Sequence, residues 1–227
     1  MPARNTPLVT DHFYHVYNRG VAKLPIFHNK RDYERFLLTV EYYHLDSPGL
    51  KLSHLLLMQR QDRIKRLSEH LQNSTPLVDI ICYTLMPNHI HLLLKQRKDA
   101  GISKFCRLLF NSYNKYFNRK HDRVGPLFQG NFKAVRITNQ EELLHVSRYI
   151  HLNPITAFII HKEDLEDFPW SSYQDYLHEI RSFLSTEIIL SSFRSIDAYK
   201  EFTEDQVDYA KKLSELKYAI IEKYPDE

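Results

Sequence analysis

Two histidines, His89 and His91, are separated by a single residue in a segment that has the pattern of a β-hairpin. Apolar residues precede Pro87-Asn88, and a second apolar run follows, which predicts two strands joined by a tight turn. Because successive side chains on a strand point to opposite faces, His89 and His91 would share one face, about 7 Å apart. Two imidazoles held on one rigid strand can bind a single metal ion. The same spacing also arises incidentally, so the pair alone does not establish a site.

A helix predicted from about residue 140 to residue 152 offers a third metal ligand and a nucleophile. Tyr149 and Asn153 are four residues apart and would share one helix face. Tyrosine is a weak nucleophile at its reference pKa of about 10, and a divalent cation on the attacked phosphate would offset that weakness. The simpler interpretation makes Tyr149 a core residue and Asn153 a helix terminator, since the residue before Pro154 disfavours helical backbone.

The donor types indicate which metal such a site would take. Imidazole nitrogens combined with an amide oxygen and open coordination positions suit Mg²⁺ or Mn²⁺. Zinc stays an alternative, because imidazole also binds it well. We therefore expect His89, His91 and Asn153 as ligands of a divalent metal. His15 would lie near the pair if its own strand is central in the sheet.

The elements that must position these residues alternate between strands and helices. Strand patterns cover residues 11–19, 77–85, 89–96 and 131–137, and helical patterns cover residues 29–45, 52–71, 101–120 and 140–152. This order predicts an α+β fold, with a ferredoxin-like antiparallel sheet and helices packed on one face. The other face would be open to a substrate, and His89 and His91 should point there or to its rim.

The domain organisation follows from the same patterns. We expect a catalytic domain over residues 1–160, with a helical insertion at about 48–75, and a helical C-terminal extension over residues 161–227 packed on that domain. In the extension, Thr203 and Gln206 have the spacing of a capping box for a final acidic helix that reaches about Ile221.

The net charge of +3 conceals an uneven distribution. Residues 1–138 contain 22 Lys and Arg and 10 Asp and Glu, giving +12, whereas residues 139–227 contain 9 and 18, giving −9. A basic segment with interspersed tyrosines and phenylalanines suits single-stranded nucleic acid, where bases stack and phosphates pair with cations. The candidate DNA contacts are Arg19, Lys104, Arg107, Lys115, Arg119, Lys133 and Arg136. The alternative is that these cations form solvated faces that keep the protein soluble.

Composition also bears on the compartment. The sequence has no run of 18 apolar residues and no apolar signal-peptide core near its first residue. Cys82 and Cys106 both lie in apolar contexts, which predicts buried free thiols rather than a disulfide. We therefore expect a cytoplasmic protein with no membrane partner.

Several motifs resemble those of the HUH single-tyrosine transposases, and most closely the REP-associated tyrosine transposases. The stretch Leu85-Met-Pro-Asn-His-Ile-His-Leu resembles their histidine signature, and Ser147-Arg-Tyr-Ile-His-Leu-Asn-Pro resembles their catalytic helix. Weaker similarities lie at residues 14–20, in the family's first strand, at 124–135, before the catalytic helix, and at 170–173, just beyond it. The resemblance covers roughly residues 11–177 in the family's order.

This resemblance implies a specific reaction. His89 and His91 match the metal ligands, Tyr149 matches the nucleophile, and Asn153 stands where related enzymes use a polar third ligand. The family cuts single-stranded DNA near imperfect hairpins, leaves a 5′-phosphotyrosine and a free 3′-OH, and rejoins strands by the reverse attack. A monomer and a homodimer stay open, as does the use of Tyr149 within one subunit or across two.

Two other functions compete with a transposase. A non-catalytic module could bind single-stranded DNA or RNA on the same sheet, as other ferredoxin-like sheets do. A metal hydrolase could use activated water, although the sequence offers no obvious general base for it. The joint presence of His89, His91 and Tyr149 favours the transposase, because pure binding requires none of them.

Overall fold

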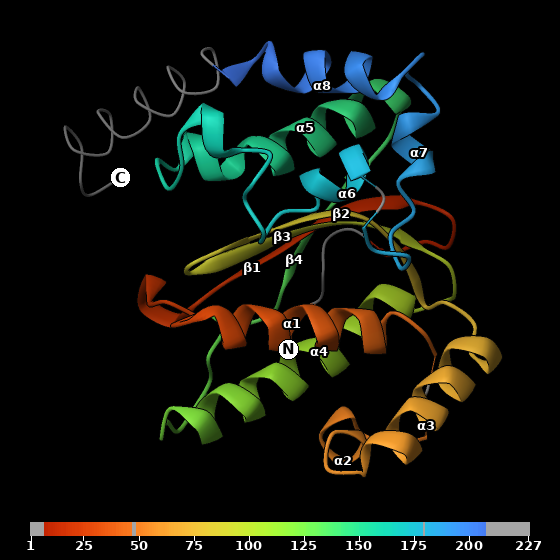
Figure 1. Cartoon of the computed structure of the whole chain (residues 1–227), viewed down its shortest axis with the longest axis vertical. Helices are drawn as coiled ribbons and strands as arrows, with labels where there is room; N and C mark the ends of the chain where they lie inside the picture. The colour runs from red at the N-terminus through yellow and green to blue at the C-terminus, as the bar shows by residue number, and fades with distance from the viewer. Residues whose placement is uncertain (1–6, 47–48, 179, 208–227) are drawn as a thin grey trace. The chain divides into compact units, whose positions relative to one another are not determined.

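A computed structural model describes residues 7–46, 49–178 and 180–207, and its centre is a four-stranded sheet (Figure 1). The strands are β1 (Phe13–Arg19), β2 (Val78–Met86), β3 (His89–Gln96) and β4 (Lys133–Ile137), in the order β2-β3-β1-β4. In the ferredoxin-like pattern, one helix lies between the first strand and a hairpin of the next two strands, and a second helix precedes the fourth strand. Here the helices at these two places in the chain are residues 30–43 and 101–120, and the first is followed by the helices of the predicted insertion. This order and connectivity confirm the predicted α+β, ferredoxin-like fold.

The two faces of the sheet differ in the residues they carry. β1 is antiparallel to both neighbours, with Arg19 opposite His89 and Tyr17 opposite both His91 and Lys133. Opposed residues share a face, so the histidines lie on the face of Tyr17 and Arg19. The alternate residues of β1 and β3 form the other face, where most are fully buried and apolar or aromatic: Tyr14, Val16, Ile90, Leu92 and Leu94. At the strand ends this face carries two buried polar residues, Asn18 and Gln96.

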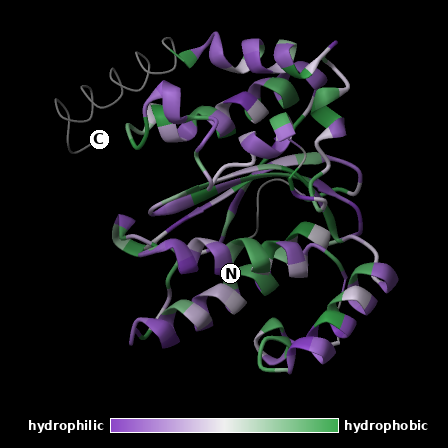
Figure 2. Cartoon of the chain, viewed as in Figure 1, coloured by the Kyte–Doolittle hydropathy of each residue, from purple (hydrophilic) through white to green (hydrophobic). Residues whose placement is uncertain are grey.

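Helices α1 (Lys30–Tyr43) and α4 (Gly101–Lys120) cover that apolar face (Figure 1). They pack against each other, and α4 packs against β3. Both helices alternate between apolar and polar residues, as amphipathic helices do (Figure 2). The apolar spacing of α4 predicts one buried stripe, and five of its six residues are fully buried: Ile102, Phe105, Leu109, Tyr113 and Phe117. The sixth, Tyr116, is half-buried.

The single helix predicted over residues 52–71 is wrong. The chain forms two helices, α2 (Leu52–Leu55) and α3 (Arg60–Asn73), both within the predicted insertion. Each is tied separately to α1: the N–H of Leu52 donates to the Tyr43 hydroxyl at 3.1 Å, and His70 pairs with the carbonyl of Tyr42 at 3.0 Å. Each of the two helices therefore has its own contact with α1.

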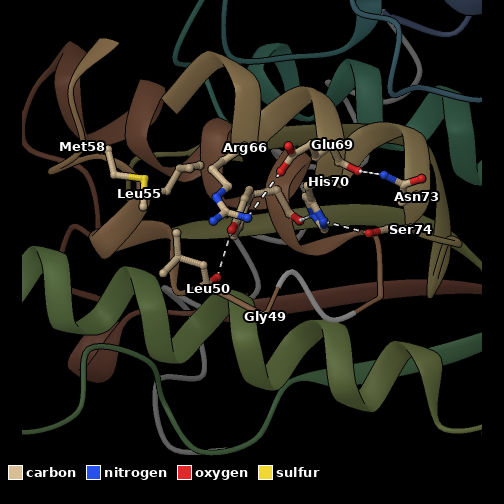
Figure 3. Close-up of a pocket in the computed structure, with 10 residues that line it drawn as sticks. Gly49, Leu50, Leu55, Met58, Arg66, Glu69, His70, Asn73 and Ser74 are labelled. Atoms are coloured by element: carbon tan, nitrogen blue, oxygen red, sulfur yellow. Dashed lines mark hydrogen bonds and ion pairs between the residues drawn. The ribbon is translucent and has the colours of Figure 1, made fainter. Parts of the chain in front are cut away.

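A cavity of about 530 Å³ lies among these helices (Figure 3). Its lining comes from α1, α2, α3 and the segments that join them: Tyr42, Gly49, Leu50, Leu55, Met58, Arg66, Glu69, His70, Asn73 and Ser74. His70 is buried at its wall, where the Ser74 hydroxyl lies 2.8 Å from Nδ1 and the Tyr42 carbonyl accepts from Nε2. This histidine therefore joins α3 to α1.

Replacing His70 with alanine is expected to destabilise the fold by about 1–3 kcal/mol, because the Tyr42 carbonyl loses its donor. Urea unfolding followed by circular dichroism measures this loss. His54→Ala is the matched control, since His54 is an exposed histidine in the same insertion. Equal stabilities of the two variants would contradict the structural role of His70.

By its contacts the chain divides into two compact units. The first takes the described residues up to Ile80 together with Pro87–Ile137, and the second takes Ile81–Met86 and the described residues from Thr138 onward. The helices of the second unit are α5 (Gln140–Thr156), α6 (Tyr173–His178), α7 (Glu187–Leu190) and α8 (Ile196–Glu204). Helix α5 thus groups with the later residues, and the boundary at residue 160 stays a prediction.

Helix α5 continues through Pro154 to Thr156, which contradicts the predicted helix end at Asn153. A proline removes one backbone hydrogen bond, here the one to the carbonyl of Ile150 four residues earlier. That carbonyl accepts instead from the Thr84 hydroxyl, at 2.7 Å. A tertiary donor on β2 therefore compensates for the missing N–H and lets the helix pass the proline.

This compensation can be measured with a double-mutant cycle. Thr84→Val should cost about 1–3 kcal/mol of unfolding free energy, because the buried Ile150 carbonyl loses its donor. Pro154→Ala restores a backbone N–H at that position, so it should offset part of the cost in the double variant. Strictly additive effects in chemical denaturation would contradict the proposed exchange of donors.

The capping box predicted at Thr203 is also wrong. Thr203 lies inside α8, where its hydroxyl donates to the Tyr199 carbonyl at 3.0 Å. The N-cap of this helix is Ser195, whose side chain accepts from the N–H of Ala198. The predicted final helix to about Ile221 lies outside the described residues.

Two further expectations can be compared with the structure. Cys82 and Cys106 are buried free thiols, as predicted, and burial raises the pKa of Cys82 well above its usual range. In the part of the chain that the structure describes, no helix has the length and apolar content needed to cross a bilayer.

Candidate active site

A cluster of three histidines occupies the face of the sheet opposite α1 and α4. The rings of His89 and His91 lie 5.0 Å apart, nearly perpendicular to each other. His15 on β1 brings its Nε2 to 2.8 Å from Nδ1 of His91. β1 lies between β3 and β4, so the expectation that a central first strand would place His15 beside the pair is confirmed.

The turn before β3 contacts the other histidine. Nδ1 of His89 lies 2.7 Å from Oδ1 of Asn88, and Nδ2 of Asn88 donates to the carbonyl of Lys23 at 3.0 Å. The backbone around Asn88 is held as well, because its carbonyl accepts from the N–H of Gly20 at 2.8 Å. The segment that follows β1 therefore supports the turn that begins the histidine strand.

The protonation states of the buried histidines suit metal binding. Burial lowers the pKa of His15 to about 4. Burial also lowers the pKa of His91 well below its usual range, and the neighbouring His15 and His89 lower it further. Both imidazoles are thus neutral near pH 7, and a neutral imidazole is the form that binds a metal ion.

The histidine pair supplies only some of the ligands that a divalent cation needs. Among the residues that the structure describes, no three His, Cys, Asp or Glu side chains group around a common metal position. His89 and His91 supply two nitrogen donors, so further ligands would have to be oxygens of an amide, a phosphate or water. Such a mixed set with open positions fits Mg²⁺ or Mn²⁺ better than a closed zinc site.

Tyr149 and Asn153 lie on α5, in the second unit. Tyr149 is 50% exposed, which rules out the interpretation of this residue as a core side chain. Asn153 is only 6% exposed, and it lies within the helix rather than at its end. The histidines belong to the first unit, so the structure groups the predicted site residues into two sets: the histidine pair, and Tyr149 with Asn153.

The side chains that flank Tyr149 hold α5 to other helices of its unit. Arg148 donates to the Phe202 carbonyl at 3.1 Å and lies over the Phe202 ring at 4.3 Å. His151 is fully buried, with Nδ1 2.7 Å from the Tyr199 hydroxyl and Nε2 2.9 Å from the Ser172 hydroxyl. Burial lowers the pKa of His151 to about 3, so this histidine is a neutral structural residue.

The seven predicted DNA contacts do not share one surface. Arg19 and Lys133 are exposed on the histidine face of the sheet. Lys104 forms an ion pair with Asp46, a carboxylate that Lys98 also contacts. Three others, Arg107, Lys115 and Arg119, are exposed on α4. Arg136 lies opposite Tyr14, on the face of the sheet that the helices cover.

Three residues beside the histidine pair lie outside the site that the sequence predicts. The sequence indicates only a turn position for Asn88 and only a nearby position for His15. Tyr17 stacks beside His91, with ring centroids 6.0 Å apart. The alternation of β1 already places His15 and Tyr17 on one face, but the register against β3 was needed to bring that face to His91.

Comparisons with known proteins show what parts of the chain are similar to. The family model described as "Transposase IS200 like" matches residues 53–153, somewhat less than half of the chain. One similar solved structure is described as the structure of the REP-associated tyrosine transposase bound to a REP hairpin. It has 17% sequence identity and a TM-score of 0.46, and the match covers 81% of this chain and 90% of that one. No curated protein matches the chain.

Proposed function

We propose that the chain is an IS200-like transposase, because the model of that family matches residues 53–153, and that it cleaves and rejoins single-stranded DNA in transposition. One observation carries this proposal. The matched segment contains both strand histidines and ends on the helix that bears Tyr149 and Asn153, which are the four residues that the chemistry requires.

His89 and His91 are proposed to hold a divalent cation, Mg²⁺ or Mn²⁺, with the amide oxygen of Asn153 as a further ligand. When bound, the cation would neutralise charge on the scissile phosphate and orient that group for in-line attack. The neutral state of the buried His91 supports this role, since its ring need not lose a proton before one nitrogen binds the cation.

Tyr149 is proposed to act as the nucleophile. Its phenol oxygen forms a bond to phosphorus and loses its proton to solvent, while the bond from phosphorus to the 3′ oxygen breaks and that oxygen takes a proton from solvent to leave as a 3′-OH. The product is a 5′-phosphotyrosine, which a 3′-OH can attack to reform a phosphodiester and release the phenol. The phosphate bond energy is conserved in the covalent link, so no external energy source is needed. The half-exposed side chain supports this role, because a nucleophile must reach its substrate.

Arg19 and Lys133 are proposed to contact the phosphates of the bound strand. Replacing both with alanine should weaken binding of a single-stranded oligonucleotide about 10-fold near physiological salt. The slope of the logarithm of the binding constant against the logarithm of the salt concentration should become shallower by about one to two, since one to two fewer counterions are released. Fluorescence anisotropy over a salt series measures both effects. Arg107→Ala with Lys115→Ala is the matched control, since it removes two exposed cations from the outer face of α4. A larger loss in this control would assign the strand to α4 instead.

The decisive experiment uses labelled single-stranded DNA that contains an imperfect hairpin. With Mn²⁺ or Mg²⁺, the protein should form a denaturation-resistant adduct together with a fragment that ends in 3′-OH. Equal binding with and without metal, and no cleavage, would instead indicate a non-catalytic binding module. Cleavage without any covalent intermediate would indicate a hydrolase that uses water.

A further inference from the structure

The orientation of the Asn88 amide determines which nitrogen of His89 carries the proton. The Lys23 carbonyl is only an acceptor, so the Asn88 atom that contacts it at 3.0 Å must be the NH₂ group. Oδ1 of Asn88 therefore points to Nδ1 of His89, at 2.7 Å. An oxygen acceptor at this distance requires a proton on Nδ1, which leaves the lone pair of a neutral His89 on Nε2.

His91 is contacted at the same ring position. Its Nδ1 lies 2.8 Å from Nε2 of His15, so one of these two nitrogens carries the proton and the other accepts it. When His91 is the donor, its lone pair is on Nε2, as for His89. In metal sites a ligating histidine commonly donates its second ring N–H to a neighbouring acceptor, which sets both tautomer and ring orientation.

We propose that Asn88 and His15 are positioning residues that hold His89 and His91 as Nδ1–H tautomers, so that both rings present Nε2 to one divalent cation. The inference rests on the metal site of the proposed function and adds the two residues that select the ligating atoms. Each is a positioning residue because it acts through the ring that it contacts.

The backbone that supports Asn88 is built to stay in place. Lys23, which supplies the fixed carbonyl, has a φ of 58°, in the left-handed region that few side chains adopt. Gly20 packs so closely that a Cβ there would collide with the Leu24 carbonyl oxygen. The carbonyl of Pro87 accepts from the N–H of Ile26 at 2.8 Å. The segment after β1 and the turn before β3 thus hold each other in place, which disfavours a flip of the Asn88 side-chain amide.

The test combines tautomer assignment with metal affinity. In the metal-free protein, long-range ¹H–¹⁵N NMR spectra should show Nδ1–H tautomers for both His89 and His91. His15→Ala should disturb the His91 tautomer and weaken Mn²⁺ binding about 10–100-fold in calorimetry, the usual cost of losing such a contact. His15→Gln supplies an amide oxygen as acceptor and should restore most of the affinity.

Asn88 is tested in the same way. Asn88→Leu should release His89 and weaken Mn²⁺ binding to a similar extent, whereas Asn88→Asp retains an acceptor oxygen and should keep the Nδ1–H tautomer. His12→Ala is the matched control, because His12 lies next to the same strand and bonds to the Thr10 carbonyl rather than to the pair.

The outcomes separate this inference from the proposed function. If the parent protein binds Mn²⁺ and His15→Ala and Asn88→Leu leave its affinity and both tautomers unchanged, the positioning roles are overturned while the metal site stands. An Nε2–H tautomer at His89 in the parent overturns the inference directly. If the parent binds no Mn²⁺, the metal site of the proposed function fails, and the presentation of Nε2 to a cation fails with it.

Discussion

Replacing Tyr149 with phenylalanine should abolish the covalent protein–DNA adduct, with a loss of about 10³-fold or more in the rate of strand cleavage. The substitution removes only the phenol oxygen that would bond to phosphorus. The aromatic ring and the contacts that hold α5, made by Arg148 and His151, stay in place. The measurement is single-turnover cleavage of a labelled hairpin oligonucleotide, followed by separation of the adduct under denaturing conditions.

The interpretation of this result depends on a control and on mapping the adduct. Tyr33→Phe removes the hydroxyl of a tyrosine on α1 that stacks on Phe27, and it should cleave like the parent protein. Mass spectrometry of the parent adduct after proteolysis should locate the nucleotide on the peptide that contains Tyr149. Adduct formation by Tyr149→Phe at the parent rate would remove Tyr149 from the mechanism.

Replacing His89 or His91 with alanine should reduce both Mn²⁺ affinity and metal-dependent cleavage by about 100-fold or more, since each variant removes one of the two nitrogen donors. DNA binding should change much less, because the strand is proposed to be held by cations and not by imidazoles. Calorimetry with Mn²⁺ and anisotropy with the oligonucleotide measure the two effects separately. A chelator should have the same effect on cleavage as the substitutions.

His91 is buried, so its replacement must be separated from a loss of folding. Urea unfolding of both variants gives that control, and His89→Ala carries more weight because its ring is less buried. His12→Ala, which removes a histidine outside the cluster, should leave Mn²⁺ affinity unchanged. Retained cleavage at parent rates by a folded His89→Ala protein would show that the reaction does not depend on the histidine pair.

Local patterns were sufficient to predict the sheet and its histidine face. The alternation of side chains on a strand has a period of two residues, so it can be followed in the sequence without any tertiary contact. It placed His89 and His91 together, and it placed His15 with Tyr17 and Arg19. The buried stripe of α4 was equally predictable, because helical spacing depends only on local geometry.

Helix boundaries were less predictable, because tertiary partners decided them. A proline ends most helices. Helix α5 passes Pro154 because the Thr84 hydroxyl replaces the N–H that this proline lacks. Thr203 has the sequence signature of an N-cap, but Ser195 begins the helix earlier and places Thr203 inside it. In both cases a local rule was valid and a neighbouring residue outweighed it.

The sequence by itself determined the four strands, the shared face of His89 and His91, and the pairing of Tyr149 with Asn153 on one helix, since all three follow from short-range periodicity. Only the tertiary structure decided which side chains surround the histidines. The contact of His15 with His91 joins residues 76 positions apart, and the orientation of Asn88 depends on a carbonyl 65 positions away. The type and spacing of the catalytic candidates are thus local properties, whereas the atom that each histidine presents is set by hydrogen bonds that form only when distant segments pack together.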